Sequence, residues 1–308
     1  MASSARTRVA RSSPRVSVSG RPRAVLTFVG FIFLIFVVWE GSKLIGGTPW
    51  RPLGSVPGAG VVFWDPPLQW DFANDLNLPH VWTIAYALGQ PFQRGVPGTL
   101  AEHLFGAAMY TWREAALGFA LGTILGLVLA TAFVHSRLLE RAFVPYVVAS
   151  QTVPIIALAP MIVFALGQNV MSVVVISMYL TFFPVTIAMI RGLRSFDPRA
   201  LELMRSYAAS DRTIYRKLRF PASLPYLFTA LKIGATASIV GAIIGEDTGS
   251  IQAGLGRIIS TFNSYYITGP EKLWAAILAA ALLGMAFFTC VRAVEHLALR
   301  GRSLEVAA

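Results

Sequence analysis

Long apolar segments alternate with short polar ones along most of this chain. Each apolar segment is close to the length of about 20 residues that an α-helix needs to cross the hydrocarbon core of a bilayer. The six segments cover residues 24–45, 105–134, 144–166, 170–190, 224–244 and 273–291. The pattern therefore predicts an all-α integral membrane protein with about six transmembrane helices.

The stretches outside these segments differ from one another. Residues 1–23 hold six arginines and no acidic residue, together with Ser and Pro, which is typical of a disordered basic tail. No small-x-small cleavage site follows, which favours a tail over a signal peptide. Residues 46–100 are rich in Pro, Gly and Trp without a spanning segment, so we expect an extracytoplasmic insertion after the first transmembrane helix, 24–45. Residues 101–300 form the main transmembrane domain.

Composition and charge add an orientation to this pattern. The 308 residues are 55% hydrophobic, and they carry 26 Lys and Arg against 15 Asp and Glu. With six spans, 19 of the 26 basic residues fall on the side that holds both termini and the loop at 191–225. Lys and Arg are enriched in cytoplasmic segments, so both termini and this loop are expected in the bacterial cytoplasm, with the chain in the inner membrane. Because the charge reports orientation, it does not indicate nucleic acid.

Prolines and polar residues single out the segment 144–166. Pro145, Pro154 and Pro160 each remove a backbone hydrogen bond that lipid cannot replace, so this segment is expected to face protein or a water-filled path. A packed, kinked helix and a lining of the translocation path both fit the pattern. The candidate path residues are Gln151, Thr152, Pro154, Tyr179 and Phe182.

Intramembrane chemistry is otherwise sparse. Glycine recurs every four residues over 118–126 and predicts close packing against a neighbouring helix. Lys232 is expected to extend toward the cytoplasmic interface, and Glu246 is a candidate outer gate or interface residue. No nucleotide-binding or catalytic motif is present, and the lone Cys290 provides neither a disulfide nor a metal cluster. We therefore expect no catalytic residue, metal or cofactor in this chain, and an external energy source.

The loop at 191–225 carries eight basic and three acidic residues between two apolar segments. Its dipeptide Asp197-Pro198 is a helix-start signal, which predicts a short helix to about Tyr207. The small pair Ala208-Ala209 then predicts a compact corner. Ser210 is expected to cap a second short helix to about residue 218, and Phe220-Pro221 to end it. Two short helices in water have the shape of a docking element, although an amphipathic loop on anionic lipid also fits.

At these residues the chain resembles the membrane-spanning permeases of bacterial ABC importers of the binding-protein-dependent type. That family carries Glu-Ala-Ala, three residues, Gly, nine residues and Ile-x-Leu-Pro in a cytoplasmic loop. The spacing is preserved here, while Leu203 and Met204 replace the two alanines and Ala208 replaces the glycine. Alanine fits the corner where its φ stays negative. The resemblance implies an ATPase-coupling role for Glu202, Leu203, Met204, Ala208, Ala209, Ser210, Leu218, Phe220 and Pro221.

The resemblance extends from about residue 100 to 300. It includes the run Ser150–Pro160 and Glu246 followed by Gly254-Leu255-Gly256. It implies a complex in the lipid bilayer with a second permease subunit, a cytosolic ABC ATPase dimer that holds ATP and magnesium, and an extracytoplasmic solute-binding protein. In such a complex this chain is a transport subunit and not itself an enzyme.

The resemblance is to the branch that imports sulfonates, taurine, nitrate and vitamins. Aromatic side chains in the spans favour a planar solute such as riboflavin, because planar rings stack on one another. Membrane packing explains the same rings. The thiamine pyrimidine precursor and the sulfonate, taurine or nitrate group remain alternatives. The rival classes are an ion-coupled secondary transporter, which needs no ATP, and a membrane scaffold or enzyme, in which the loop has no role in transport.

Overall fold

The computed structural model describes residues 20–52, 61–250 and 253–300, and most of the predicted basic tail lies outside them. The described residues form helices and connecting turns without a β-strand, so the all-α prediction is confirmed. The chain divides into two compact units, one that ends at His80 and one that begins at Val81. The predicted insertion at 46–100 is thus shared between the two units.

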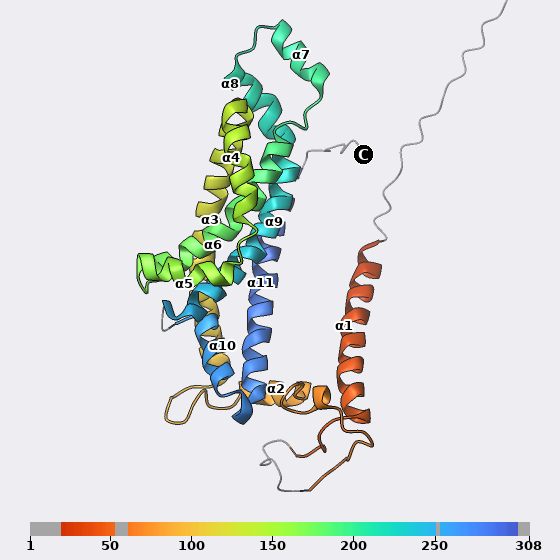
Figure 1. Ribbon diagram of the computed structural model, residues 1–308. Coiled ribbons are helices and arrows are strands. Elements are labelled where there is room, and N and C mark those ends of the chain that lie inside the picture. The colour runs from red at the N-terminus through yellow and green to blue at the C-terminus, as the bar shows by residue number, and fades with distance from the viewer. Residues whose placement is uncertain (1–19, 53–60, 251–252, 301–308) are drawn as a thin grey trace, which may run out of the picture. The chain divides into compact units, whose positions relative to one another are not determined.

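The first unit consists of helix α1, Gly20–Ile45, and the segment that follows it (Figure 1). Hydrogen bonds from two tryptophans and one lysine hold this segment against the end of α1. The indole Nε1 of Trp39 donates to the carbonyl of Pro79 at 3.0 Å, and Trp64 Nε1 donates to Leu44 O at 2.9 Å. These long-range bonds give the described part of the segment a defined structure, in which the longest regular element is the single turn Asp71–Ala73.

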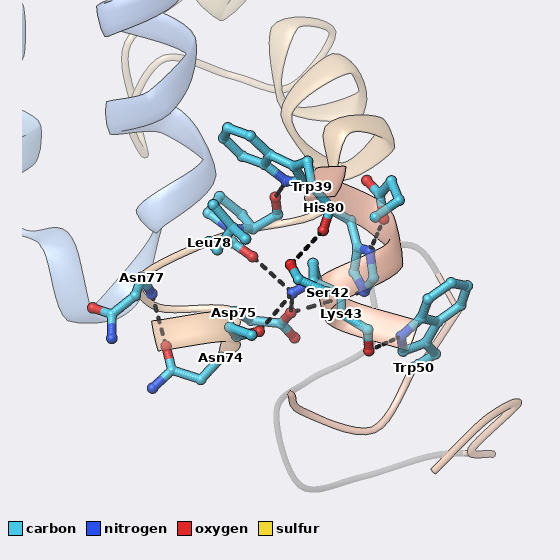
Figure 2. A network of polar contacts seen from close by, with 12 residues as sticks. Trp39, Ser42, Lys43, Trp50, Asn74, Asp75, Asn77, Leu78 and His80 are labelled. Atoms are coloured by element: carbon cyan, nitrogen blue, oxygen red, sulfur yellow. Dashed lines mark hydrogen bonds and ion pairs between the residues drawn. The ribbon is translucent and has the colours of Figure 1, made fainter. Parts of the chain in front are cut away.

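Lys43 is the centre of the polar network in this unit (Figure 2). Its side chain is completely buried, and its ammonium donates to Asp75 Oδ1 at 2.6 Å, Leu78 O at 2.7 Å and Ala73 O at 3.3 Å. An ammonium group has three protons, so every donor of Lys43 has an acceptor. Next to it, His80 Nδ1 lies 2.7 Å from Glu40 Oε2. The network holds residues 73–80 against the last turn of α1.

The core of the second unit is made by three long helices: α3, Leu100–His135; α6, Val170–Gly192; and α9, Phe220–Gly245. α6 packs against both α3 and α9. The glycines at 118, 122 and 126 lie in the α3–α6 contact, as their spacing predicts: a Cβ on Gly122 would lie 2.7 Å from the carbonyl oxygen of Met178. Small residues therefore set how closely the two backbones approach.

The predicted span 144–166 is not one helix. Two helices, α4, Arg137–Ser150, and α5, Ile155–Leu166, meet at an angle of 101°. The bend falls at residues 151–154, where Pro154 has no N–H to donate and becomes the residue before α5. Pro145 and Pro160 stay inside their helices. The predicted segment is therefore broken into two helices at its middle proline, and its assignment as one span stays a prediction.

Three more helices of this unit pack on the core: the two short ones lie at the end away from the charged loop, and the long one runs along α9 (Figure 1). They are α2, Val81–Leu88; α10, Leu255–Ser264; and α11, Pro270–Ala298. Lys272 at the start of α11 donates to the carbonyls of Pro91 and Phe92 at 2.8 and 3.0 Å, which ties the loop after α2 to α11.

Among the described residues, four helical segments are long and apolar enough to cross a membrane: α3, α6, the continuous stretch 211–248, and α11. The bent pair α4 and α5 adds a fifth if it is one span. α1 contains the first predicted segment, 24–45. An integral membrane protein is confirmed, and the count of six spans stays a prediction.

Candidate functional site

The charged loop contains the first predicted short helix, α7, Pro198–Ser206. Its start is as expected: the Asp197 side chain accepts the backbone N–H of Arg199 at 2.9 Å, and Pro198 takes the first helical position. No residue of α7 is buried, and the helix projects beyond the bundle (Figure 1). Glu202 is exposed, and Leu203 is 58% exposed despite its apolar side chain. An exposed apolar face of this kind marks a contact surface.

The corner after α7 differs from the expectation for an alanine. Ala208 has a φ of 52°, and it is the only non-glycine residue with positive φ in the described part of the chain. The position therefore takes the left-handed conformation that glycine adopts at low cost. The prediction that Ala208 keeps a negative φ is wrong. An L-residue in this conformation costs about 1–2 kcal/mol. The backbone N–H of Ala209 still closes the corner on Met204 O at 3.0 Å.

The second short helix begins as predicted but does not end where predicted. Ser210 accepts the N–H of Thr213 and caps α8, Asp211–Ile214. A π-helical turn, Tyr215–Arg219, then leads directly into α9. In this turn the Phe220 N–H bonds five residues back, to Tyr215 O, and the wider turn gives the ring of Pro221 room. Phe220 and Pro221 therefore continue the helix into the membrane.

This continuous helix is anchored where it enters the bundle. Ile214 is 3% exposed, and the hydroxyls of Tyr215 and Thr131 of α3 lie 3.0 Å apart. Leu218 and Phe220 are half-buried in the same region. The corner at Ala208–Ser210 is thus joined directly to one end of a helical rod that is continuous from residue 211 to 248.

Glu246 lies at the far end of that rod and is completely buried. Its Oε1 accepts the Thr111 hydroxyl of α3 at 2.7 Å, and its Oε2 accepts the Gly256 N–H at 2.7 Å. Thr111 Oγ1 also accepts the Leu255 N–H at 2.9 Å. The first two N–H groups of α10 are thus satisfied by side chains from α3 and from the end of α9. We call this set of residues, 111, 246 and 254–256, the outer junction.

The glycines of the outer junction are required by their contacts. Gly254 has a φ of +93°, and a Cβ there would lie 2.2 Å from the carboxyl carbon of Glu246. A Cβ on Gly256 would lie 2.2 Å from the carbonyl oxygen of Ile243. Contacts this short exclude a side chain at either position. The motif Gly254-Leu255-Gly256 therefore makes room for the Glu246 carboxylate.

The candidate path residues gather at the bend between α4 and α5. The hydroxyl of Tyr179 on α6 donates to the carbonyl of Ser150, and its ring centre lies 5.8 Å from that of Phe182. Gln151 ends α4, with its amide Nε2 buried and without a hydrogen-bond partner among the described residues. Thr152 and Pro154 are exposed in the bend. The five residues form one cluster, while the path itself stays a prediction.

Lys232 does not extend freely to the interface as expected. Its ammonium pairs with both carboxylate oxygens of Glu295 on α11, at 3.0 and 2.9 Å. Both side chains are about three-quarters buried, so the two charges neutralise each other inside the protein. Lys232 is therefore paired, and it is not an isolated charge within the bundle.

Sequence reasoning missed Thr111, Glu114 and Glu295. Glu114 is 2% exposed and lies one turn from Thr111 on the face of α3 that carries the glycines. The signal was present, since positions 111, 114, 118 and 122 recur at helical spacing and put two polar residues on a packed face. Glu295 gave no such signal, because its partner is 63 residues away.

Residues 122–299 match the family described as the binding-protein-dependent transport system inner membrane component. The chain belongs to this family. This binding-protein-dependent permease is also similar to curated proteins along most of its length. It is 33% identical over 240 residues to the formylaminopyrimidine transport permease protein ThiX of Halalkalibacterium halodurans, a match that covers 74% of this chain and 93% of the relative.

Two further relatives carry other substrates in their names. The permease is 28% identical to the riboflavin transport system permease protein RibX of Chloroflexus aurantiacus, over 54% of this chain and 61% of the relative. It is 28% identical to the putative aliphatic sulfonates transport permease protein SsuC of Bacillus subtilis, over 66% of this chain and 73% of the relative.

A solved structure supports the fold. The crystal structure of an amino acid ABC transporter with histidines matches with a TM-score of 0.53 at 16% identity, over 64% of this chain and 94% of that chain. At this identity the likeness concerns the fold alone. The permease is thus a membrane-spanning transport component, and the predicted resemblance to ABC importer permeases is confirmed.

Proposed function

We propose that this permease couples ATP hydrolysis by a cytosolic ATPase dimer to solute import through α7 and the corner at Ala208–Ser210. The observation that carries the proposal is that the exposed α7 joins, through one corner, a helix that is continuous from residue 211 to 248. Closure of the ATPase dimer would push on α7, and the rod would carry the displacement to the outer junction. ATP and magnesium bind the ATPase and not this chain.

The charge arrangement supports a protein partner for α7. Leu203 and Tyr207 expose apolar surface, 58% and 79% respectively, within a turn of the charged side chains of Arg199, Glu202 and Arg205. An apolar patch rimmed by charges is the surface that a helix presents to a groove. The proposed partners are completed by an extracytoplasmic solute-binding protein, which the binding-protein-dependent family supports, and by a second permease subunit.

For the solute, we propose a planar nitrogen heterocycle of the vitamin type. The relative that matches over 93% of its own length is named for formylaminopyrimidine, which favours an aminopyrimidine over riboflavin. The aromatic pair Tyr179 and Phe182 at the bend between α4 and α5 suits such a ring by stacking. Riboflavin remains a second candidate on the shorter match to the riboflavin permease.

Uptake into proteoliposomes that contain the permease, its ATPase and its binding protein tests the coupling. We expect uptake to need ATP on the ATPase side and to persist when ion gradients are dissipated. Glu202→Ala, or deletion of Ala208–Ser210, is expected to abolish ATPase co-purification while membrane insertion is unchanged. Asp65→Ala, an exposed acid of the first unit, is the matched control and should behave as wild type. Co-purification that survives both changes would overturn the coupling proposal.

Isothermal titration of the binding protein tests the solute separately. We expect micromolar or tighter binding of the aminopyrimidine and weaker binding of riboflavin and taurine. Tight binding of taurine or another sulfonate would overturn the solute proposal and leave the coupling proposal intact.

A further inference from the structure

A basic cavity lies beside the charged loop, on the side of the membrane that we assign to the cytoplasm. Its volume is about 830 Å³, and it is bounded by the start of α4, the segment after α6 and the π-helical turn before α9. Four arginines and one acidic residue line it: Arg137, Arg141, Arg194, Arg219 and Glu140. The lining therefore carries three more positive than negative charges.

Two of the four guanidinium groups are held in place by other side chains. Arg194 donates to both carboxylate oxygens of Glu140, at 2.8 and 2.7 Å. The guanidinium carbon of Arg219 lies 5.2 Å from the ring centre of Phe196. Glu140 also interacts electrostatically with Arg137 and Arg141, but one carboxylate cannot balance four guanidinium groups, so the cavity keeps a net positive charge.

The other two arginines have no ion-pair partner among the described residues. Arg137 and Arg141 are one helical turn apart on α4, on either side of Glu140 in sequence. Guanidinium groups present planar forks that match the oxygens of a phosphate. The cavity thus has two guanidinium groups held in place and two without an ion pair among the described residues. Together they can donate hydrogen bonds to an anion with several oxygens.

The cavity is also continuous with apolar surface. Val134, Val144, Pro145 and Phe196 complete its lining. Farther along α4, one turn after Val144 on the same face, Val148 is 47% exposed. A soluble phosphate has no apolar part that could contact this surface, whereas the acyl chains of a lipid would cover it.

We propose that this cavity binds the phosphate diester of an anionic glycerophospholipid such as phosphatidylglycerol, with the headgroup among the arginines and the acyl chains along α4. The shared chemistry, a phosphate, could also come from a soluble anion. The lipid is favoured because charge and apolar surface adjoin in the order in which a lipid carries them. The site is separate from α7 and does not depend on the transported solute.

Native mass spectrometry of the purified permease tests the assignment, after exchange into micelles with equal phosphatidylglycerol and phosphatidylcholine. We expect phosphatidylglycerol to be retained selectively. Each basic residue near a membrane surface contributes about 1 kcal/mol to anionic lipid binding, so Arg137→Gln with Arg141→Gln should weaken retention by roughly 30-fold. The matched control, Arg212→Gln with Arg216→Gln, removes two exposed charges from the neighbouring charged loop, outside the cavity, and should change retention less than about threefold.

A second pair of variants guards against a folding defect. Arg137→Lys with Arg141→Lys keeps the charge, should fold as wild type and should restore most of the retention. Equal losses in the cavity and control variants would overturn the proposal. So would retention that does not distinguish the two lipids, or saturable binding of inorganic phosphate that excludes phosphatidylglycerol.

Discussion

The Glu246 carboxylate and the Thr111 hydroxyl lie 2.7 Å apart, although 135 residues separate them in the chain. Both side chains are completely buried, and both also accept a backbone N–H from the start of α10. The contact therefore joins the end of the continuous helix 211–248 to α3 and α10, because Glu246 and Thr111 each form hydrogen bonds with more than one element.

Removal of the Thr111 hydroxyl is expected to weaken this junction. Thr111→Val leaves the Leu255 N–H and one oxygen of Glu246 without a partner, so we expect a loss of about 1–3 kcal/mol in unfolding free energy. The control is Thr236→Val, because the exposed Thr236 hydroxyl bonds only within its own helix, to Ile233 O. Thermal unfolding in detergent compares the two. An equal effect of both changes would contradict the role given to the junction.

Ala208→Gly is expected to stabilise the coupling corner. The φ of 52° costs an alanine about 1–2 kcal/mol that glycine does not lose, offset in part by the greater freedom of glycine when unfolded. Hydrogen exchange at the N–H of Ala209, which closes the corner on Met204 O, should become slower. Ala209→Gly, next to it with negative φ, should make the same exchange faster. Slower exchange in both variants would refute this explanation.

Two glycines of α3 are expected to respond in opposite directions. Gly122→Ala puts a Cβ 2.7 Å from Thr181 Cβ and Met178 O, so it should destabilise the protein by about 1–3 kcal/mol. Gly106→Ala meets nothing within 4 Å and should stabilise α3 by about 0.5–1 kcal/mol. Unfolding midpoints in detergent measure both. A destabilising effect of Gly106→Ala would contradict the packing described for α3.

Lys232 and Glu295 are expected to be energetically coupled and dispensable for the driving force. Lys232→Met or Glu295→Gln alone leaves one charge unpaired in the protein interior, so each should cost about 1.5–3 kcal/mol. The double variant should recover part of that loss. In proteoliposomes, the double variant should still import in an ATP-dependent manner. ATP-dependent transport that becomes dependent on an ion gradient would favour the secondary-transporter class.

Local signals in the sequence predicted the elements and failed at points that depend on contacts. Asp197 and Ser210 cap the helices predicted for them, because a cap involves only the next three residues. Pro221 was expected to end a helix, but a π-helical turn accommodates it. Proline chemistry alone does not distinguish these outcomes. Nor did the sequence show that Pro154, rather than Pro145 or Pro160, is the point where the chain turns by 101°.

The sequence also predicted only part of the candidate site: it indicated which residues belong together, but not the contacts that explain them. Glu246 and Gly254-Leu255-Gly256 were recognised together, but their geometric reason is the short distance between the Glu246 carboxylate and the glycine backbone. Thr111 and Glu295 were missed because each acts through a residue on another helix. The positive φ at Ala208 was missed because alanine rarely adopts it.

The central claim is that α7 and its corner lie in the cytoplasm and contact the ATPase. The single Cys290 is exposed and can be replaced by alanine, which leaves a background without cysteine. Tyr207→Cys in this background places one thiol at a position that is 79% exposed. Arg94→Cys, in the loop after α2, serves as the outer control.

Labelling of Tyr207→Cys with a membrane-impermeant maleimide is the most direct test. The account predicts labelling in inverted vesicles but not in intact cells, the reverse for Arg94→Cys, and at least tenfold slower labelling at position 207 once the ATPase is bound. Labelling of position 207 from outside the cell, or a rate that the ATPase does not change, would contradict it.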